Sequence, residues 1–527
     1  MKKKGKGFHN MEKELTGRNK WGFASNCIPR DLTYVLVSLF FLTFIQYTCG
    51  FTNQQFIVLS SIIVLCRVWD AVNDPMMSTI ITNTKSRFGR YRPWILIGAI
   101  SNSVFLVLMF LSPGLTGWGY VAYLGIAYLL YGMTFTMNDV SYWSLLPHLA
   151  RSKDSRDKLT GLVAIFASVG SFISGGLIPI LTTGNMIIAY RIYAVVAALL
   201  FIVSQLLVFL LVKDKNDPNE EKEKNVSLKD MFKIIFNNKQ LLVMAAVVLL
   251  YSLGSVLLNA FGTNFFYFKF GYDGTYMTIF TVIYALGTIV AQILFAGIAK
   301  KHKRADIVKV TTILLVVGYL VFFGLCNLPI EWFGNKYVYL VILCLIGIII
   351  FAAQGIFYLT MLVMLTNTIE YDEWKTGRRE EAIVFSVRPF MVKLSTALQQ
   401  GILTLVLVIS GLFSLTNQLS DLEAAKAAGE IADITEQANA ILSTVTPWQM
   451  LGLTAGMCVI PVLLYILQYI LIKKKYIIDE EMYEKMLLEI DQRKNPQPVE
   501  VIPEEVKKAT TRKPRTKKTS PEINNEE

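Results

Sequence analysis

Charged side chains are scarce in this 527-residue sequence. Asp, Glu, Lys and Arg make up 17% of the residues, hydrophobic residues make up 54%, and the mean hydropathy is +0.47. The core of a soluble domain stops growing near ~250–300 residues, so a soluble fold of this length could not hide so much apolar surface. The composition therefore excludes an ordinary soluble protein and indicates a polytopic membrane protein.

Histidines and cysteines are too few and too dispersed to build a catalytic or metal centre. The three histidines, His9, His148 and His302, fall in polar arms or loops, and the six cysteines show no CxxC spacing. The chain also has no Gly-rich phosphate loop, no HExxH helix and no Ser/His/Asp set at membrane depth. We therefore expect no enzyme, no organic cofactor, no resident metal and no ATP-driven pump. A membrane enzyme acting on lipid-linked sugars would need an acid or metal cluster, and the sequence offers none.

Long apolar runs repeat along the chain. Runs of about 20 apolar residues are long enough to cross a bilayer as helices. The sequence predicts twelve of them, in an all-α polytopic membrane protein, centred near residues 40, 65, 103, 131, 170, 200, 254, 288, 317, 352, 400 and 460.

The positive charges predict the orientation of these spans. The net charge is +12, yet the connections on one side hold only Lys269, Lys336 and Lys426, and nearly all other Lys and Arg lie on the opposite side. Because positive residues stay in the cytoplasm, both termini are predicted to be cytoplasmic, in a multi-pass protein of the cytoplasmic membrane. The charge thus reflects topology, and we expect the lipid bilayer and a small solute as partners, not nucleic acid.

The chain divides into two similar halves. The expected parts are a cytoplasmic arm (1–20), a six-helix bundle (21–212), a polar central loop (213–239), a second bundle (240–472) and a tail (473–527). A short basic loop follows the second span of each half, KSRFGRYRP and then KKHKRAD. Two corresponding six-span bundles are typical of secondary transporters. An Ala/Glu-rich outer loop (414–447) predicts a short surface helix, and the tail predicts one amphipathic helix before a disordered end.

The segment RVWDAVNDP carries two acids inside an apolar span. Asp70 and Asp74 are four residues apart and so share one helix face. A charge at the bilayer centre costs at least ~2.5–3.5 kcal/mol, and such residues usually mark an ion or substrate path. With Asn73 they supply the oxygen ligands that a hard cation prefers, and two close carboxylates tend to retain a positive partner, either a metal ion or a proton. The alternative is that Arg67 neutralises Asp70 in a structural ion pair, although one Arg cannot satisfy both acids.

A second polar face lies in MTFTMNDVSYWSLLP. Thr136, Asp139 and Trp143 fall at i, i+3 and i+7, on one side of a helix. An aromatic ring beside a carboxylate is a common way to hold a sugar, because the ring stacks on C–H groups and the acid accepts from hydroxyls. A satisfied buried Asp beside a packing Trp is an equally open interpretation. Thr136 either adds an oxygen to the cation site or bonds its own backbone.

Two basic residues, Arg388 and Lys393, lie inside a predicted span, VFSVRPFMVKLSTAL. Buried cations need partners, and Asp31 or Asp139 are candidates; structural pairing and substrate contact both remain open. The depth of Asp31 depends on where the first helix starts. A start at Leu32 leaves Asp31 at the edge, whereas a start near Trp21 places it about 15 Å deep.

Three segments in this order, WDAVNDP with TNTKSRFGRYRPWILIG, MTFTMNDVSYWSLLP, and IEYDEWKTGRREEAIVFSVRPFMVKLSTAL, resemble the glycoside–pentoside–hexuronide:cation symporters, of which melibiose permease is the best-known member. The resemblance covers most of the chain from Trp21 to Leu471 and implies the major facilitator fold. It implies a sodium-type cation site and, beside it, a group of sugar contacts. The implied cation ligands are Asp70, Asn73, Asp74 and Thr136, and the implied substrate contacts are Arg30, Asp31, Asp139, Trp143, Tyr358 and Lys393.

The sequence departs from the family pattern around the sugar. Ala164 stands where the fifth helix of melibiose permease has a sugar-touching Arg, Arg388-Pro389 replaces Gln-Thr, and Asn367 replaces an acid. Arg388 is therefore a further candidate substrate contact, and an anionic sugar such as a uronide is a hypothesis.

The expected function is symport of a sugar, glycoside or hexuronide with sodium, a proton or lithium, by alternating access in a monomer. The alternative is an uncoupled or differently coupled major-facilitator transporter for another small solute.

Overall fold

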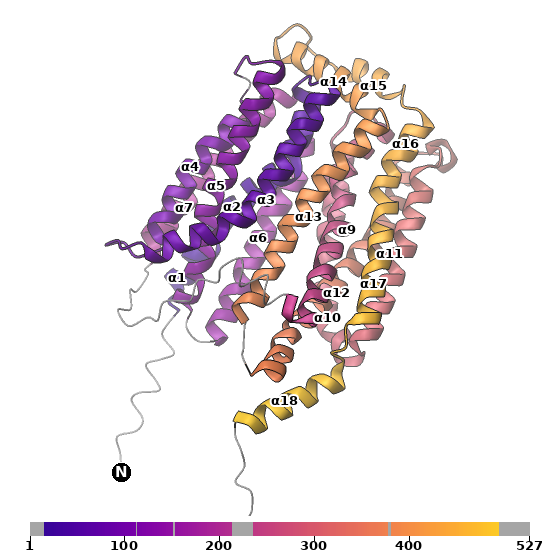
Figure 1. Cartoon of the computed structure of the whole chain (residues 1–527). Helices are drawn as coiled ribbons and strands as arrows, with labels where there is room; N and C mark the ends of the chain where they lie inside the picture. Colours follow the sequence, from indigo (N-terminus) through magenta and orange to yellow (C-terminus); the bar gives the residue numbers. More distant parts are fainter. Residues whose placement is uncertain (1–14, 112, 151–152, 213–235, 378–380, 495–527) are drawn as a thin grey trace, which may run out of the picture.

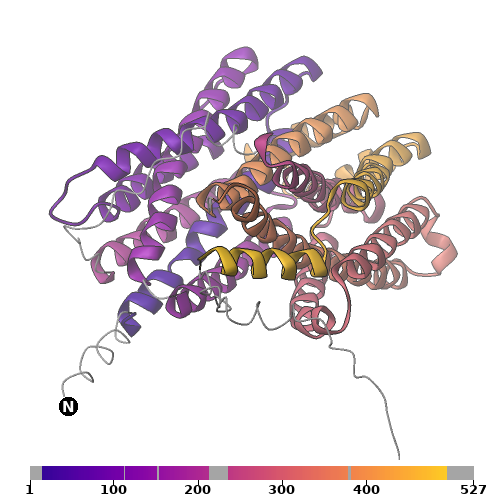
Figure 2. The same cartoon turned by 60° about the horizontal axis from the view of Figure 1, so that its bottom comes forward.

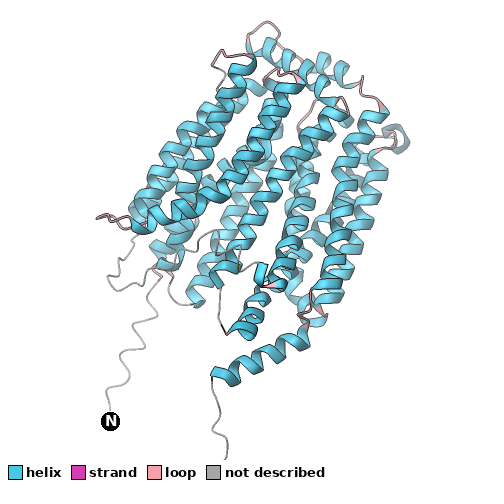
Figure 3. Cartoon of the chain, in the orientation of Figure 1, coloured by secondary structure: helices cyan, strands magenta, loops and turns pink. Residues whose placement is uncertain are grey.

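The structure is a computed structural model that describes residues 15–111, 113–150, 153–212, 236–377 and 381–494. Within these ranges every regular element is a helix, and no strand occurs (Figure 3). The expectations for most of the N-terminal arm, for nearly all of the central loop and for the end of the tail lie outside the described residues.

The first half contains six long helices and one short helix. Their bounds are α1 (Gly17–Ala24), α2 (Cys27–Thr48), α3 (Asn53–Asn83), α4 (Arg92–Phe110), α5 (Gly117–Leu149), α6 (Lys153–Thr182) and α7 (Met186–Leu211). The second half repeats this plan with more elements at its connections. Its helices are α9 (Lys239–Phe270), α10 (Thr275–Lys301), α11 (Arg304–Cys326), the 3₁₀ turn η1 (Ile330–Phe333), α12 (Lys336–Thr376), α13 (Glu381–Ile409), α14 (Leu412–Ala427), α15 (Thr435–Leu442), α16 (Pro447–Thr454), the π-helical turn η2 (Ala455–Val459), α17 (Ile460–Lys475) and α18 (Glu480–Lys494).

The twelve predicted spans correspond to these helices. Eleven continuous helical stretches are long and apolar enough to cross a membrane, and α3 makes a twelfth as a bent span. The bend of 41° separates Asn53–Asp70 from Val72–Asn83. Pro75 lies four residues after Ala71, where a proline ring clashes with the carbonyl group and removes one backbone hydrogen bond. The bend therefore places the residues around Asp70 at a break in the helix.

Small residues bring helices of the first half into close contact. A Cβ atom added to Gly170 of α6 would clash with the carbonyl oxygen of Ile28 in α2, and one added to Gly98 of α4 would lie 2.6 Å from the amide nitrogen of Asn138 in α5. Glycine at these positions lets the backbones approach, as is usual at helix interfaces in membranes.

The two halves meet along α3 and α13 and along α6 and α10. One end of the molecule carries α14 and α15 (Figure 1). At that end, buried side chains join the two halves directly. The side chains of Gln46 and Tyr47 donate to Asn264 Oδ1 at 2.6 and 2.7 Å, and Phe56 stacks on Phe413 with ring centroids 4.0 Å apart. We call this the α14 end. The opposite end carries α1 and α18 and is called the terminal end (Figure 2).

Two helices outside the membrane spans, α14 and α18, pack against the bundles. The tail pattern predicted one helix, and α18 is that helix; Trp374 at the end of α12 donates to Glu489 of α18 at 2.6 Å. The prediction of a short surface helix in the 414–447 loop agrees with the short helices α14 and α15. One face of α14 is buried, because Leu419 and Glu423 are almost fully covered by the helices beneath.

Candidate functional site

Most of the predicted site residues come together between the halves. Arg30 and Asp31 lie on α2, Asp70, Asn73 and Asp74 on α3, and Thr136, Asp139 and Trp143 on α5. The second half contributes Tyr358 from α12 and Arg388 and Lys393 from α13. The contacts among them form three groups, centred on Arg30, on Asp74 and on Arg388.

Arg30 is the centre of the first group. Its guanidinium forms ion pairs with Asp31 at 3.1 Å and with Asp139 at 3.3 Å, although only 3% of the side chain is exposed. The guanidinium also lies over the rings of Tyr142, at 4.5 Å, and Trp143, at 5.2 Å. The indole Nε1 of Trp143 donates to Asp139 Oδ1 at 3.1 Å. Asp139 is therefore positioned by two donors, while 29% of its side chain and 40% of Trp143 remain exposed, so sugar contact and a satisfied Asp both stay open for this pair.

Asp74 is the centre of the second group, and it links the halves. Lys393 Nζ forms an ion pair with Asp74 Oδ2, and Thr136 Oγ1 donates to Asp74 Oδ1 at 3.0 Å. Thr136 and Asp139 are three residues apart on α5, so the two groups lie within one helical turn of each other. The suggestion that Lys393 pairs with Asp31 or Asp139 is wrong, because Asp74 holds its ammonium.

Asp70 sits one turn before Asp74 with its own basic partner. Arg67 Nη1 lies 3.8 Å from Asp70 Oδ2, and both side chains are less than 10% exposed. The structural ion pair between Arg67 and Asp70, which the sequence offered as the alternative to a cation site, is therefore present. A Cβ atom on Gly132 of α5 would lie 2.7 Å from Asp70 Oδ1, so a larger residue there would have to displace this carboxylate. The amide nitrogen of Asn73 is buried and has no hydrogen-bond partner among the residues that the structure describes.

Arg388 belongs to a separate group on the second half. It donates to the hydroxyl of Tyr358, and its guanidinium lies 5.5 Å from the centre of that ring. The suggested acidic partners for Arg388 are therefore also wrong. Arg388 is exposed, in contrast to Arg30 and Arg67, so its charge is available to a ligand.

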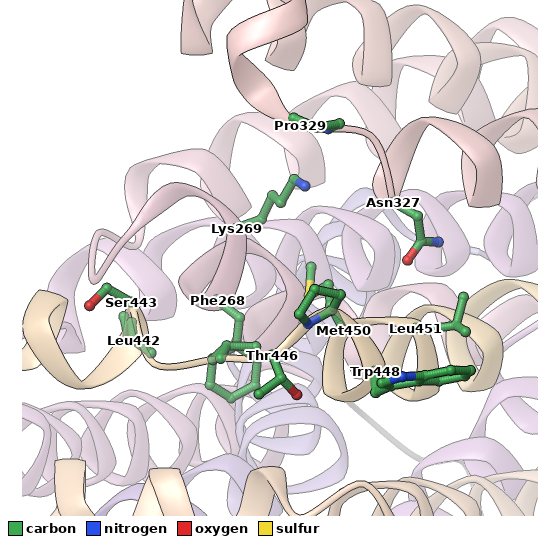
Figure 4. A pocket seen from close by; sticks show the side chains of 12 residues that line it. Phe268, Lys269, Asn327, Pro329, Leu442, Ser443, Thr446, Trp448, Met450 and Leu451 are labelled. Atoms are coloured by element: carbon green, nitrogen blue, oxygen red, sulfur yellow. The ribbon is translucent and has the colours of Figure 1, made fainter.

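Several of the charged side chains in the site are partly exposed to solvent. The side chains of Asp31, Asp139 and Asp74 retain 18%, 29% and 30% of their surface, and that of Lys393 retains 21%. A small solute can therefore reach these groups without unfolding the bundle. By contrast, a cavity of about 600 Å³ beside Lys269 and Trp448 lies at the α14 end of the second half and includes none of the site residues (Figure 4).

The depth of Asp31 follows from the first helices. The chain is already helical from Gly17, with one turn around Asn26 between α1 and α2. Asp31 thus lies inside a helical stretch rather than at its edge, which agrees with the deeper of the two placements.

Two functional neighbours were missing from the sequence interpretation. Gly132 makes room for Asp70, and Tyr142 supports Arg30 with its ring. Nothing in the spacing of these residues marks them, since their role depends on the approach of another helix.

Comparison with known proteins identifies the family. A family profile described as "MFS/sugar transport protein" matches residues 22–480, which is most of the chain. The chain belongs to the MFS/sugar transport protein family. Members of this family are transporters and not enzymes, and the resemblance to the glycoside–pentoside–hexuronide:cation symporters is confirmed.

The relatives of this MFS/sugar transport protein carry sugar-related names. It is 25% identical over 423 residues to a lactose permease of Lactobacillus delbrueckii subsp. bulgaricus, covering 76% of this chain and 64% of the permease. It is 27% identical over 427 residues to a raffinose carrier protein of Pediococcus pentosaceus, covering 77% and 64%. The chain thus spans slightly less than two thirds of these relatives. A glucuronide carrier protein homolog of Escherichia coli K12 is 23% identical over 500 residues, covering 92% of this chain and 98% of that one.

Solved structures agree with the fold. A bacterial homolog of the human lysosomal transporter Spinster, in an inward-facing and unoccupied conformation, matches with a TM-score of 0.57 at 12% identity, over 87% of this chain and 97% of that chain. The nucleoside transporter NupG, as a mutant, matches with a TM-score of 0.54 at 12% identity, over 84% and 98%. Both support the major facilitator fold of this family member.

Proposed function

We propose that this protein is a secondary transporter that couples the movement of a sugar or glycoside to that of a monovalent cation. The single observation that carries the proposal is the ion pair between Lys393 of the second half and Asp74 of the first. It brings a basic side chain to the acids at the point where the two halves meet, so a change of charge at Asp74 acts on both halves at once.

The charges of the site leave room for one cation. Among the described side chains, four acids (Asp31, Asp70, Asp74 and Asp139) face three bases (Arg30, Arg67 and Lys393) within ion-pair distance. One negative charge therefore remains, and a low-dielectric site favours its neutralisation. Carboxylate, amide and hydroxyl oxygens from Asp70, Asp74, Asn73 and Thr136 suit sodium, lithium or a proton. Asn73, whose amide nitrogen has no partner within the described part of the chain, can turn its side-chain oxygen toward a cation without losing a bond of that nitrogen.

Lys393 offers a physical route to coupling. A cation that binds Asp74 competes with the ammonium of Lys393 for the same carboxylate, and the released ammonium becomes a hydrogen-bond donor for a solute. Each ligand then raises the affinity for the other by the same factor. Asp139 and Trp143, one turn along α5, supply a carboxylate and a ring face for a sugar, and Arg30 holds the carboxylate in place.

Alternating access fits the contacts between the halves. The buried contacts around Asn264, Phe56 and Phe413 close the α14 end. With both termini in the cytoplasm, as the positive charges indicate, the α14 end faces outside and the closed side is the outer one. The solute would then leave toward the terminal end.

The test is uptake of a panel of labelled glycosides into vesicles, each with an imposed sodium or proton gradient. The proposal expects accumulation that follows one of the two gradients and that is lost in Asp74→Asn. Uptake that ignores both gradients favours the alternative, an uncoupled transporter of the same fold.

The nature of the sugar is a second question. Arg388 is exposed and bonds only to the Tyr358 hydroxyl in the contacts described above, so it suits an anionic sugar such as a uronide. Arg388→Gln should reduce uptake of a labelled uronide far more than uptake of a neutral glycoside, which serves as the internal control. An equal loss of both would remove the uronide hypothesis.

A further inference from the structure

Helix α14 carries a polar face that binds the backbone of the other half. Asn417, Ser420 and Glu423 are three residues apart in sequence and lie on one side of the helix. Asn417 Nδ2 donates to the carbonyl of Phe51 at 2.7 Å, and Ser420 Oγ accepts from the amide of Gly50 at 3.1 Å. Asn417 and Ser420 thus reach main-chain groups of the first half, although α14 belongs to the second.

Glu423 makes the strongest of these contacts. One carboxylate oxygen accepts from the backbone N–H of Met186 at 2.6 Å, and the other accepts from the hydroxyl of Tyr272 at 2.6 Å. Only 1% of the Glu423 side chain is exposed. Tyr272 lies between α9 and α10, so the carboxylate is anchored in the second half while it binds the first.

Met186 is the first residue of α7, and this helix lacks a cap of its own. Asn185, at the N-cap position, makes no side-chain capping bond. The first N–H groups of a helix have no intrahelical partner, and a negative charge there is favoured by the helix dipole. Glu423 therefore supplies from the second half the cap that α7 lacks in the first.

We propose that Glu423 is the positioning residue that holds the α14 end closed, so that losing its bond either to Met186 at the N-terminus of α7 or to Tyr272 is a required step whenever the two halves separate at that end. This proposal rests on the proposed function in one respect: the two halves must separate at the α14 end during the transport cycle. It follows from geometry, because the carboxylate cannot stay on both Tyr272 and Met186 once the halves move apart.

Glu423 should dominate over its two neighbours on α14. Its carboxylate binds two buried donors at once, and a buried donor left without a partner loses its full hydration. The bonds of Asn417 and Ser420 are neutral, and water can replace them at low cost when the end opens. The loss of the carboxylate leaves a buried N–H and a buried hydroxyl without their partner in the closed state alone, which corresponds to a population change of roughly tenfold or more toward the open state.

The surroundings of Glu423 contain few other charges. Lys426 on the same helix is the nearby base, and the phenols of Tyr272, Tyr267 and Tyr190 face the carboxylate from the elements packed against it. Burial raises the pKa of Glu423 above its ordinary value, and its bonds from Tyr272 and Met186 lower it in part.

The experiment measures the distance between the halves at the α14 end in the full-length protein. Spin labels are placed on cysteines introduced at Leu115, in the loop before α5, and at Trp332, in the turn η1, which are 45% and 73% exposed. Cys49 is replaced by alanine, since the other five native cysteines are buried. Distance distributions are recorded for the parent, for Glu423→Ala and for Asp421→Ala, a matched removal of an exposed acid from the same helix.

The parent and Asp421→Ala should show mainly the short distance, and Glu423→Ala should raise the ratio of long to short distance roughly tenfold. Identical distributions in Glu423→Ala and Asp421→Ala would overturn the proposal. If Glu423→Ala does not fold, Tyr272→Phe removes one donor to the carboxylate without removing the acid. It should give a smaller shift in the same direction, and no shift there also overturns the proposal.

The measurement is independent of the transported solute. Absence of gradient-driven sugar uptake in the parent would count against the proposed function, and it would leave the distance distributions to decide the role of Glu423.

Discussion

Replacing Lys393 by methionine tests whether its ammonium competes with the coupling cation for Asp74. Methionine keeps most of the apolar volume of the side chain and removes the charge. In the parent, a cation must displace the ammonium from Asp74 Oδ2, whereas in Lys393→Met the carboxylate keeps, of these two donors, the hydroxyl of Thr136 at 3.0 Å. We therefore expect the variant to bind the coupling cation more tightly.

The magnitude follows from Coulomb's law and solvent screening. Two unit charges about 4 Å apart attract by about 4 kcal/mol at an effective dielectric constant near 20. Because Lys393 and Asp74 retain 21% and 30% of their side-chain surface, water screens the pair, and we take about 1–3 kcal/mol as the cost of displacing the ammonium. This range corresponds to roughly 5–150-fold in affinity.

The assay is calorimetric titration of the purified protein with sodium at fixed pH and without sugar, repeated at a second pH to detect competition by protons. Lys300→Met, on the exposed face of α10, is the matched control and should bind like the parent. Asp74→Asn should lose most of the binding, because the carboxylate itself is gone.

A Lys393→Met variant that is folded but binds the cation equally or more weakly would refute the competition. It would mean that the ammonium supports the cation site rather than blocking it. A variant that binds the cation tightly but no longer gains affinity when sugar is added would support both parts of the coupling scheme.

Two further predictions concern the fit of Asp70 and the titration of Glu423. Gly132→Ala places a Cβ atom 2.7 Å from Asp70 Oδ1 and should weaken cation binding about tenfold or more, whereas Gly119→Ala, on the same helix with open space around it, should not, as the same calorimetric titration would show. Since burial raises the pKa of Glu423 in the closed state, that state takes up a proton more readily than the open one, where the acid meets water near its ordinary pKa of 4.5. The closed fraction in the spin-label experiment should therefore grow as the pH falls from the raised pKa toward about 4.5, and this dependence should vanish in Glu423→Ala; an unchanged slope would assign the titration to other groups.

Contacts within one helix could be predicted from the sequence. The spacing of Asp70 and Asp74, or of Thr136, Asp139 and Trp143, fixes a shared face because a helix turns by a constant angle per residue. The apolar runs likewise determined the twelve spans, since a bilayer demands helices of that length. The alternation of basic and uncharged loops gives an orientation on the same local grounds.

Contacts between different helices could not be predicted from the sequence, because they depend on the tertiary structure. The sequence listed Lys393 and several acids, but the choice of Asp74 over Asp31 or Asp139 depends on the rotation and crossing of α13 against α3. The room that Gly132 leaves for Asp70 depends in the same way on how closely α5 approaches α3.

Helix α14 shows most clearly the difference between what the sequence determines and what the tertiary structure determines. Its composition predicts a short helix, because Ala, Glu, Leu and Lys favour helical backbone wherever they occur. That Glu423 caps a helix of the other half, 237 residues away in sequence, depends on where the two bundles come together. Local geometry thus determines the elements and their faces, and only the packing of distant helices decides which charge meets which partner.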